Sequence, residues 1–237
     1  MNLPASTLLS LWETGVAHAP SARPAALLAV SAGETLDATA RLPLGRRDAR
    51  LLHWYRENAG DRLEALTDCP QCNGPVELEF EVADVERPPG LDGAVTADEG
   101  GWSLSWRPPD TLDFCHAATA STADAARQIL LDRCLTVTGG NGDPQVPAQL
   151  LAKLMKLAAV ADPQADVQLA LTCPACRADW QAPFDIGVFL WKHIETEALR
   201  LLADVHELAA SYCWSEAEIL SLSLARRSAY LQLARSA

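Results

Sequence analysis

The sequence is short of positive charge. Its 237 residues include 19 Lys and Arg against 31 Asp and Glu, a formal net charge of −12, and only three of the basic residues are lysines. Proteins that bind nucleic acid or anionic lipid neutralise phosphate groups with lysine and arginine. The charge balance therefore argues against nucleic acid and against a membrane surface as partners. With 49 % hydrophobic residues, the composition is still that of a folded globular protein.

Long apolar runs and the common catalytic motifs are also missing. No stretch reaches the roughly 18 apolar residues that a membrane-spanning helix needs, and residues 1–4 do not begin a basic and then apolar secretory signal. We therefore expect a cytoplasmic protein without a membrane span. The sequence has no Gly-x-Ser-x-Gly, no phosphate-binding loop and no dinucleotide fingerprint. We expect no enzyme activity.

What the sequence does have is seven cysteines, four of them in two Cys-Pro-x-Cys motifs. An odd count without a secretory signal argues against a disulfide framework. A Cys-x-x-Cys turn places two thiolates on one side of a tight knuckle, and two such knuckles supply the four ligands of a tetrahedral zinc site. The predicted ligands of one structural Zn²⁺ ion are Cys69, Cys72, Cys173 and Cys176.

The residues beside each motif support a zinc ribbon. Apolar and polar residues alternate in 76–82 after the first motif and in 167–171 before the second, which predicts strands. Four thiolates close the coordination shell, whereas a catalytic zinc keeps one position open for water. We therefore expect a structural metal.

The spacing of the two motifs is unusual, because one hundred residues (73–172) separate them. Each doubling of a loop costs only about 0.6 kcal/mol, whereas a structural zinc ion contributes on the order of 10 kcal/mol. We therefore predict a split ribbon with a long insertion. A redox-active pair, two unrelated pairs and a lost metal site stay as alternatives.

The predicted fold class is α+β, mostly helical, with a small antiparallel sheet that carries the split ribbon. We divide the chain into an N-terminal helical block (1–68), the ribbon sheet (69–184) with a helical insertion at about 108–161, and a C-terminal helical block (185–237), or one continuous domain. Strands are expected at 76–82, 102–106 and 167–171. Helices are expected at 6–16, 25–32, 45–59, 122–134, 147–160 and 190–212, and a last one after the capping box of Ser215 and Glu218.

The remaining cysteines and histidines are weaker candidates. Cys115 and His116 could ligate a second metal, but no partner pair stands nearby in the sequence, and a buried thiol beside a surface histidine is the better interpretation. Cys134 and Cys213 fall among apolar helical residues, which predicts core positions.

The chain resembles a known family in its specific motifs. After a helical block and the first knuckle, the second knuckle leads to Phe-Asp-Ile at 184–186 and Phe-Leu-Trp at 189–191. The C-terminal part carries Tyr-Cys-Trp-Ser-Glu-Ala-Glu-Ile-Leu at 212–220, Arg-Arg at 226–227 and Tyr-Leu at 230–231. This combination is similar to the baseplate hub assembly chaperones of contractile-tailed phages and to zinc-knuckle proteins of contractile injection system clusters. Where that family often has glycine before Trp-Ser, this chain has Cys213.

The resemblance implies a non-enzymatic assembly factor that engages a baseplate, hub or tape-measure protein. Because Trp and Tyr dominate binding hot spots, we hypothesise a client contact through Trp191, Tyr212, Trp214, Ile219 and Tyr230. Two other functions stay open: a zinc-ribbon regulator of transcription or translation, and a metal-dependent hydrolase that uses Cys115 and His116. The apolar seam of 190–212 suits a core or a dimer equally, so the oligomeric state is not predicted.

Overall fold

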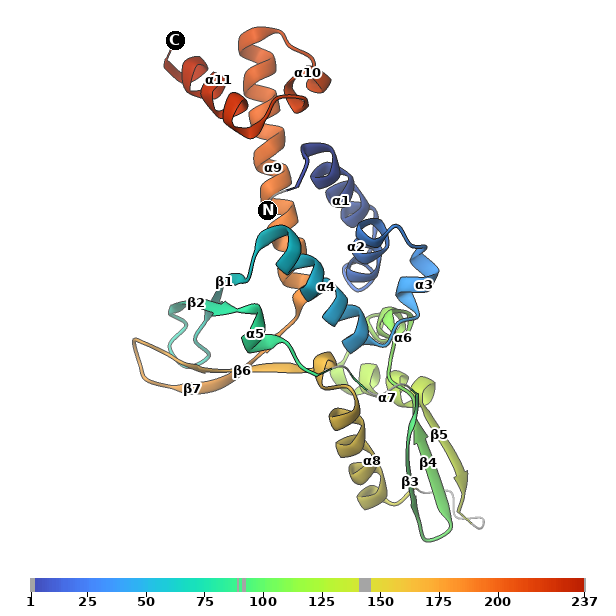
Figure 1. Cartoon of the computed structure of the whole chain (residues 1–237). Helices are drawn as coiled ribbons and strands as arrows, with labels where there is room; N and C mark the ends of the chain where they lie inside the picture. Colours follow the sequence, from blue (N-terminus) through green and yellow to red (C-terminus); the bar gives the residue numbers. More distant parts are fainter. Residues whose placement is uncertain (1–2, 89, 91–92, 141–145, 237) are drawn as a thin grey trace.

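A computed structural model of the chain describes residues 3–88, 90, 93–140 and 146–236. It is an α+β protein with a majority of helix and small antiparallel sheets, as predicted (Figure 1). The helices are α1 (Ala5–Ala17), α2 (Arg23–Ala32), α3 (Leu36–Ala40), α4 (Leu44–Ala59), α5 (Val82–Val85), α6 (Thr111–Ala117), α7 (Ala123–Cys134), α8 (Ala148–Ala161), η1 (Pro163–Ala165), α9 (Ile186–Tyr212), α10 (Glu216–Leu220) and α11 (Leu224–Ser236). The strands are β1 (Arg62–Asp68), β2 (Pro75–Glu81), β3 (Val95–Glu99), β4 (Trp102–Trp106), β5 (Leu135–Gly139), β6 (Val167–Thr172) and β7 (Asp179–Phe184).

The main body is built by α1, α2, α4 and the first half of α9. Their apolar faces meet in one core that includes Leu11, Leu27, Leu51 and Ile194, all at most 1 % exposed. Helix α1 approaches α9 closely at Gly15, where a Cβ atom would lie 1.9 Å from the Trp191 ring. The other helices of the body therefore pack against the long helix α9, which was predicted from the regular spacing of its apolar residues.

The strands form three separate sheets, so the expected single small sheet is wrong. Strand β1 pairs with β2, β6 pairs with β7, and β3, β4 and β5 form a third sheet. Strand β1 lies in 62–68, a segment expected to belong to the N-terminal helical block. Its Leu66 is 67 % exposed while Leu63 is fully buried, and this three-residue spacing of leucines conceals the two-residue period of the strand.

The elements β3, β4, β5, α6, α7 and α8 form a lobe of their own, which we call the insertion from here on; it begins earlier than the predicted helical insertion at about 108–161 and contains a sheet. Helix α8 covers the sheet β3–β4–β5, and Leu104, Leu150 and Leu154 are fully buried between them. In Figure 1 this lobe extends away from the main body, with α6 and α7 at the junction. Strand β5 extends to Gly139, and residues 141–145 lie outside the described residues.

The C-terminal half of α9 extends past the body as an arm and carries α10 and α11 (Figure 1). A small separate core of Leu208, Ile219 and Leu231 holds these helices together. The capping box of Ser215 and Glu218 is present. The continuous last helix that we expected is instead divided at residues 221–223, because the Ser223 hydroxyl accepts the N–H of Arg226 and begins a new helix.

Candidate metal centre

Two hairpins bring the four predicted cysteine ligands to one point. Cys69 and Cys72 lie in the turn between β1 and β2, and Cys173 and Cys176 lie in the turn between β6 and β7. The sulfur atoms of Cys69 and Cys176 are 3.6 Å apart, those of Cys72 and Cys173 are 3.7 Å apart, and all four lie within 4.8 Å of one another.

These distances fit a metal held by four thiolates. A metal–sulfur bond of about 2.3 Å in a tetrahedral site gives sulfur–sulfur edges of about 3.8 Å. The separations are also far longer than the roughly 2.05 Å of a disulfide bond, and all seven cysteines are free thiols. The prediction that the two distant motifs share one site able to hold a metal ion is therefore confirmed.

Both knuckles use the same backbone geometry. The N–H of Cys69 donates to the carbonyl of Gly74 at 2.9 Å, and the N–H of Cys173 donates to the carbonyl of Ala178 at 2.9 Å. In each motif the residue after the second cysteine turns the chain with a positive φ, 54° at Asn73 and 64° at Arg177. Asparagine is a common choice for this conformation. The duplication indicates one structural unit used twice.

Burial differs between the first and second cysteine of each knuckle, and in the second knuckle the pKa values of the two cysteines differ as well. Cys69 and Cys173 are buried against Val76, whereas Cys72 and Cys176 are exposed. Backbone N–H groups, first that of Cys176, lower the pKa of Cys173 to about 6. The N–H of Ala178 also lowers the pKa of Cys176, but burial and the neighbouring cysteine sulfurs outweigh it and raise this pKa to about 12.

The surface beside the metal centre is acidic. Glu77, Glu79 and Glu81 are exposed on one face of β2, as the alternation predicts. Arg62, across the hairpin, lies 2.9 Å from Glu79. On this face the three glutamates outnumber Arg62, whereas a site for a nucleic-acid backbone carries mostly positive charge.

The second metal pair that we considered does not form a site. The Ser21 hydroxyl donates to the Cys115 sulfur at 3.3 Å, and His116 is exposed. In the described ranges, the only group of three or more potential ligands is the four-cysteine cluster. Cys134 is buried as expected. Cys213 is exposed at the end of α9, so its predicted core position is wrong.

Two of the five hypothesised client-contact residues lie inside the protein. Ile219 is fully buried in the small core of the arm, and Trp191 is 7 % exposed in the core of the body, where the Arg23 guanidinium lies 4.5 Å from its ring centroid. We correct their assignment, because amphipathic helices α9 and α10 turn both side chains inward.

The other three hypothesised residues do gather. Tyr212 stacks on Trp214 with ring centroids 4.7 Å apart, and Tyr230 meets the Trp214 ring edge to face at 4.8 Å. The Tyr212 hydroxyl donates to the backbone carbonyl of Tyr230 at 3.3 Å. All three are half-buried. They form an aromatic cluster on the arm, away from the main body.

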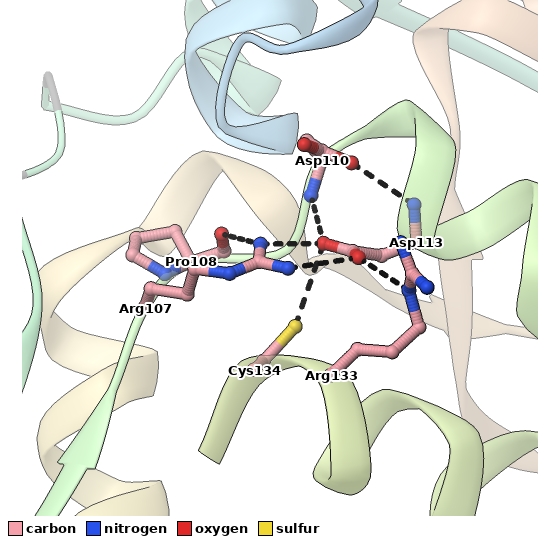
Figure 2. Close-up of polar contacts among 6 residues, drawn as sticks. All are labelled: Arg107, Pro108, Asp110, Asp113, Arg133 and Cys134. Atoms are coloured by element: carbon pink, nitrogen blue, oxygen red, sulfur yellow. Dashed lines mark hydrogen bonds and ion pairs between the residues drawn. The ribbon is translucent and has the colours of Figure 1, made fainter. Parts of the chain in front are cut away.

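A buried charge cluster in the insertion was missed from the sequence. Asp113 is fully buried. Its carboxylate accepts hydrogen bonds from Arg107 Nη1 and Nη2 at 2.6 and 2.9 Å and from Arg133 Nε at 2.7 Å (Figure 2). Burial alone would raise the pKa of Asp113, but the hydrogen bonds from Arg107, the Asp110 backbone and Arg133 lower it far below its usual range. No local pattern joins these residues, because Arg133 stands 20 positions from Asp113.

No described helix combines the length and the apolar character needed to cross a membrane. Comparisons with protein-family models, with curated proteins and with solved structures return no match to this chain.

Proposed function

We propose that this protein is a non-enzymatic, zinc-binding assembly factor that engages a baseplate, hub or tape-measure protein of a contractile phage tail or injection system. The observation that carries the binding role is the aromatic cluster of Tyr212, Trp214 and Tyr230 on an arm outside the main core. Partly exposed Trp and Tyr are the residues that dominate protein–protein contacts. The identity of the client comes from the resemblance in the cysteine motifs and the C-terminal segment.

Zinc is the ion that best suits the four-cysteine cluster. Soft thiolates in tetrahedral arrangement select zinc or iron among the common metals, and the ion's positive charge keeps the thiolates deprotonated at neutral pH. A shell filled by four protein ligands leaves no position for a substrate or an attacking water. The proposed role of the ion is therefore to join the two hairpins.

Metal analysis tests the zinc assignment. We expect the purified protein to contain one zinc ion per chain. The C69S and C173S variants should each lose the ion, because three thiolates and one hydroxyl bind zinc far more weakly. C115S, which changes a thiol outside the cluster, is the matched control and should keep it. Iron in place of zinc, or full zinc content in C69S, would contradict the assignment.

Binding to the client tests the assembly role. The chain would be co-expressed with the baseplate, hub and tape-measure proteins encoded beside its gene, and the complexes would be isolated by affinity purification. We expect one of these proteins to co-purify, and W214A and Y230A to lose most of the binding. Each variant would first be checked for an unchanged circular dichroism spectrum.

W102A is the control for that experiment. Trp102 is also half-buried, but it lies in β4 at the far end of the insertion, and its substitution should leave client binding unchanged. Binding that survives W214A and Y230A in folded protein would refute the role of the aromatic cluster. A chain that binds none of the tail proteins would refute the assembly function.

A further inference from the structure

A second candidate binding site lies where the insertion joins the main body. A pocket of about 460 Å³ opens there, in the size range of small-molecule sites. Arg41 and Pro43 line it from the body, and Arg107, Asp110 and Arg133 line it from the insertion. In a chain with a large excess of acidic residues, this pocket has three guanidinium groups against one carboxylate in its lining.

The buried carboxylate of Asp113 positions two of these arginines. It accepts hydrogen bonds from both terminal nitrogens of Arg107 on one side and from Nε of Arg133 on the other (Figure 2). Arg107 and Arg133 share this one buried carboxylate, and Asp110 is a second carboxylate close enough to act on Arg107. The Arg107 and Arg133 side chains remain 44 % and 36 % exposed, so both are reachable from the pocket.

The arginines have hydrogen-bond donors to spare. In the described part of the chain, the terminal nitrogens of Arg133 donate no hydrogen bond, and Arg41 uses only Nε, toward Asp37. Asp110 Oδ1 accepts the backbone N–H of Asp113, and the Asp110 carboxylate also acts electrostatically on Arg41 and Arg107. Guanidinium groups held in place with free N–H bonds match the paired oxygens of a carboxylate or a phosphate.

We propose that this pocket binds the oxyanion of a small organic ligand, a phosphate or a carboxylate, through Arg41, Arg107 and Arg133. Pro43, Pro108 and Leu112 supply apolar walls for the rest of the ligand. The proposal does not depend on the assembly function or on the metal.

The position of the pocket gives the ligand a structural consequence. Several hydrogen bonds join body and insertion here: the Leu44 N–H donates to the Pro109 carbonyl at 3.0 Å, Arg47 Nη1 donates to the Thr111 hydroxyl at 3.1 Å, and the Ser21 hydroxyl donates to the Cys115 sulfur at 3.3 Å. A ligand that contacts Arg41 on one side and Arg133 on the other adds a further connection. Binding therefore reduces the motion of the insertion relative to the body.

Calorimetric titration of the full-length protein tests the site, with phenyl phosphate and benzoate as anionic probes and benzyl alcohol as the uncharged probe of similar shape. Ionic strength is held constant with chloride. We expect saturable binding of at least one anion and none of the alcohol. Binding of phenyl phosphate alone assigns a phosphate ligand, and binding of benzoate alone assigns a carboxylate. Failure of both anions at 10 mM, on the order of the weakest useful affinity, or equal binding of the alcohol, would overturn the proposal.

Variants locate the binding. R133Q removes the free terminal nitrogens and should weaken the anion about tenfold or more, whereas R41Q, which leaves the Asp113 cluster intact, should weaken it several-fold. R62Q is the matched control: Arg62 is 62 % exposed and ion-paired, much like Arg41 at 63 %. If R133Q does not fold, R41Q alone decides. An R41Q protein that binds as the wild type does, or an R62Q protein that loses as much, contradicts the assigned site.

Hydrogen exchange gives an independent readout. With the bound anion, amides of 107–113 should exchange several-fold more slowly, while those of the first knuckle at 69–74 should not change. Equal slowing in both regions would indicate general salt stabilisation and would contradict a local site.

Discussion

Among single residues, Cys213 bears an unusual conformation. It ends α9 with φ 56° and ψ 28°, in the left-handed region, which costs a non-glycine residue roughly 1 kcal/mol. Glycine is the usual residue at this place in a helix end. The position where this sequence has cysteine and the resembled family often has glycine is thus one at which the backbone itself favours glycine.

We therefore expect C213G to stabilise the arm. Relief of the left-handed strain should raise the free energy of unfolding by about 0.5–1 kcal/mol, less the added chain entropy of glycine in the unfolded state. C213A, which removes the thiol but keeps Cβ, is the control and should change little. Chemical denaturation of the wild type, C213G and C213A, followed by tryptophan fluorescence, measures the effect. A C213G protein less stable than C213A would contradict it.

Asp48 should make stability depend on pH. It is 8 % exposed beside Arg47, whose Nε lies 2.7 Å from its Oδ1. Burial raises the pKa of Asp48 to about 6, an effect that Arg47 opposes and that Asp185 and Asp162 increase. Because the folded value exceeds the unfolded value of about 4, this carboxyl stabilises the fold most at low pH. That contribution disappears as the pH rises through about 6.

Between pH 5 and 7.5 the loss should be about 1–2 kcal/mol. Urea unfolding of the wild type and of D48N at both pH values measures it. D48N carries a neutral side chain of the same size and has no carboxyl to titrate, so its stability should not fall for this reason. The stability of the wild type relative to D48N should therefore fall by about 1–2 kcal/mol as the pH rises. A constant difference would show that Asp48 does not titrate in this range.

Some residues of the candidate sites could be predicted from the sequence and others could not. The four cysteine ligands were predictable because each pair is local and its spacing imposes the turn. The Asp113 cluster was not, because its partners come from the end of β4 and the last turn of α7. Trp191 and Ile219 were misassigned because residue type alone does not say which helix face turns inward.

At the scale of elements, each of the two hairpins that carry the cysteines packs into two apolar clusters. Near the body, Leu63 and Val167 are buried in the main core. Near the turns, Val76 belongs to a small separate cluster with Cys69 and Cys173. Few apolar groups hold this outer half, so a metal bound by the cysteines supplies most of its stability.

Removal of the metal should therefore loosen only the outer half of the hairpins. After treatment with a chelator, amides of 68–75 and 172–179 should exchange much faster, while the far-ultraviolet circular dichroism of the helices should change little. The body helix α4, with its fully buried Leu51 and Leu52, is the internal reference. Cooperative loss of α4 together with the hairpins would mean that the metal holds the whole fold.

Helices were predicted better than strands, for a physical reason. The ends of α4, α7 and α8 lie within about two residues of the predicted ends. The signals are local: Gly60 ends α4, Thr122 caps α7, and regularly spaced apolar residues mark α8. Strands β1, β3, β5 and β7 were missed because half-exposed hairpins bury few side chains. Their pairing depends on partners that lie elsewhere in the chain.

At the scale of the whole molecule, the chain exposes an unusually large surface. Its accessible area is 13709 Å² for 25.5 kDa, whereas a compact monomer of this mass exposes about 10,400 Å². The excess arises from the lobed shape in Figure 1, in which the insertion and the arm extend from the body in different directions. The three cores in body, insertion and arm are separate. This architecture offers contact surfaces at both ends of the molecule.

We therefore predict that the protein has an extended shape in solution. A compact chain of 237 residues has a radius of gyration of about 18 Å, and small-angle scattering should give a clearly larger value. Light scattering must report the monomer mass of 25.5 kDa in the same sample, because a dimer would raise the radius for another reason. A monomer near 18 Å would mean that the lobes fold onto the body, which would cover the surfaces that the proposed client contact needs. The scattering result therefore bears on function as well as on shape, since an arm held away from the body leaves Trp214 open to a partner.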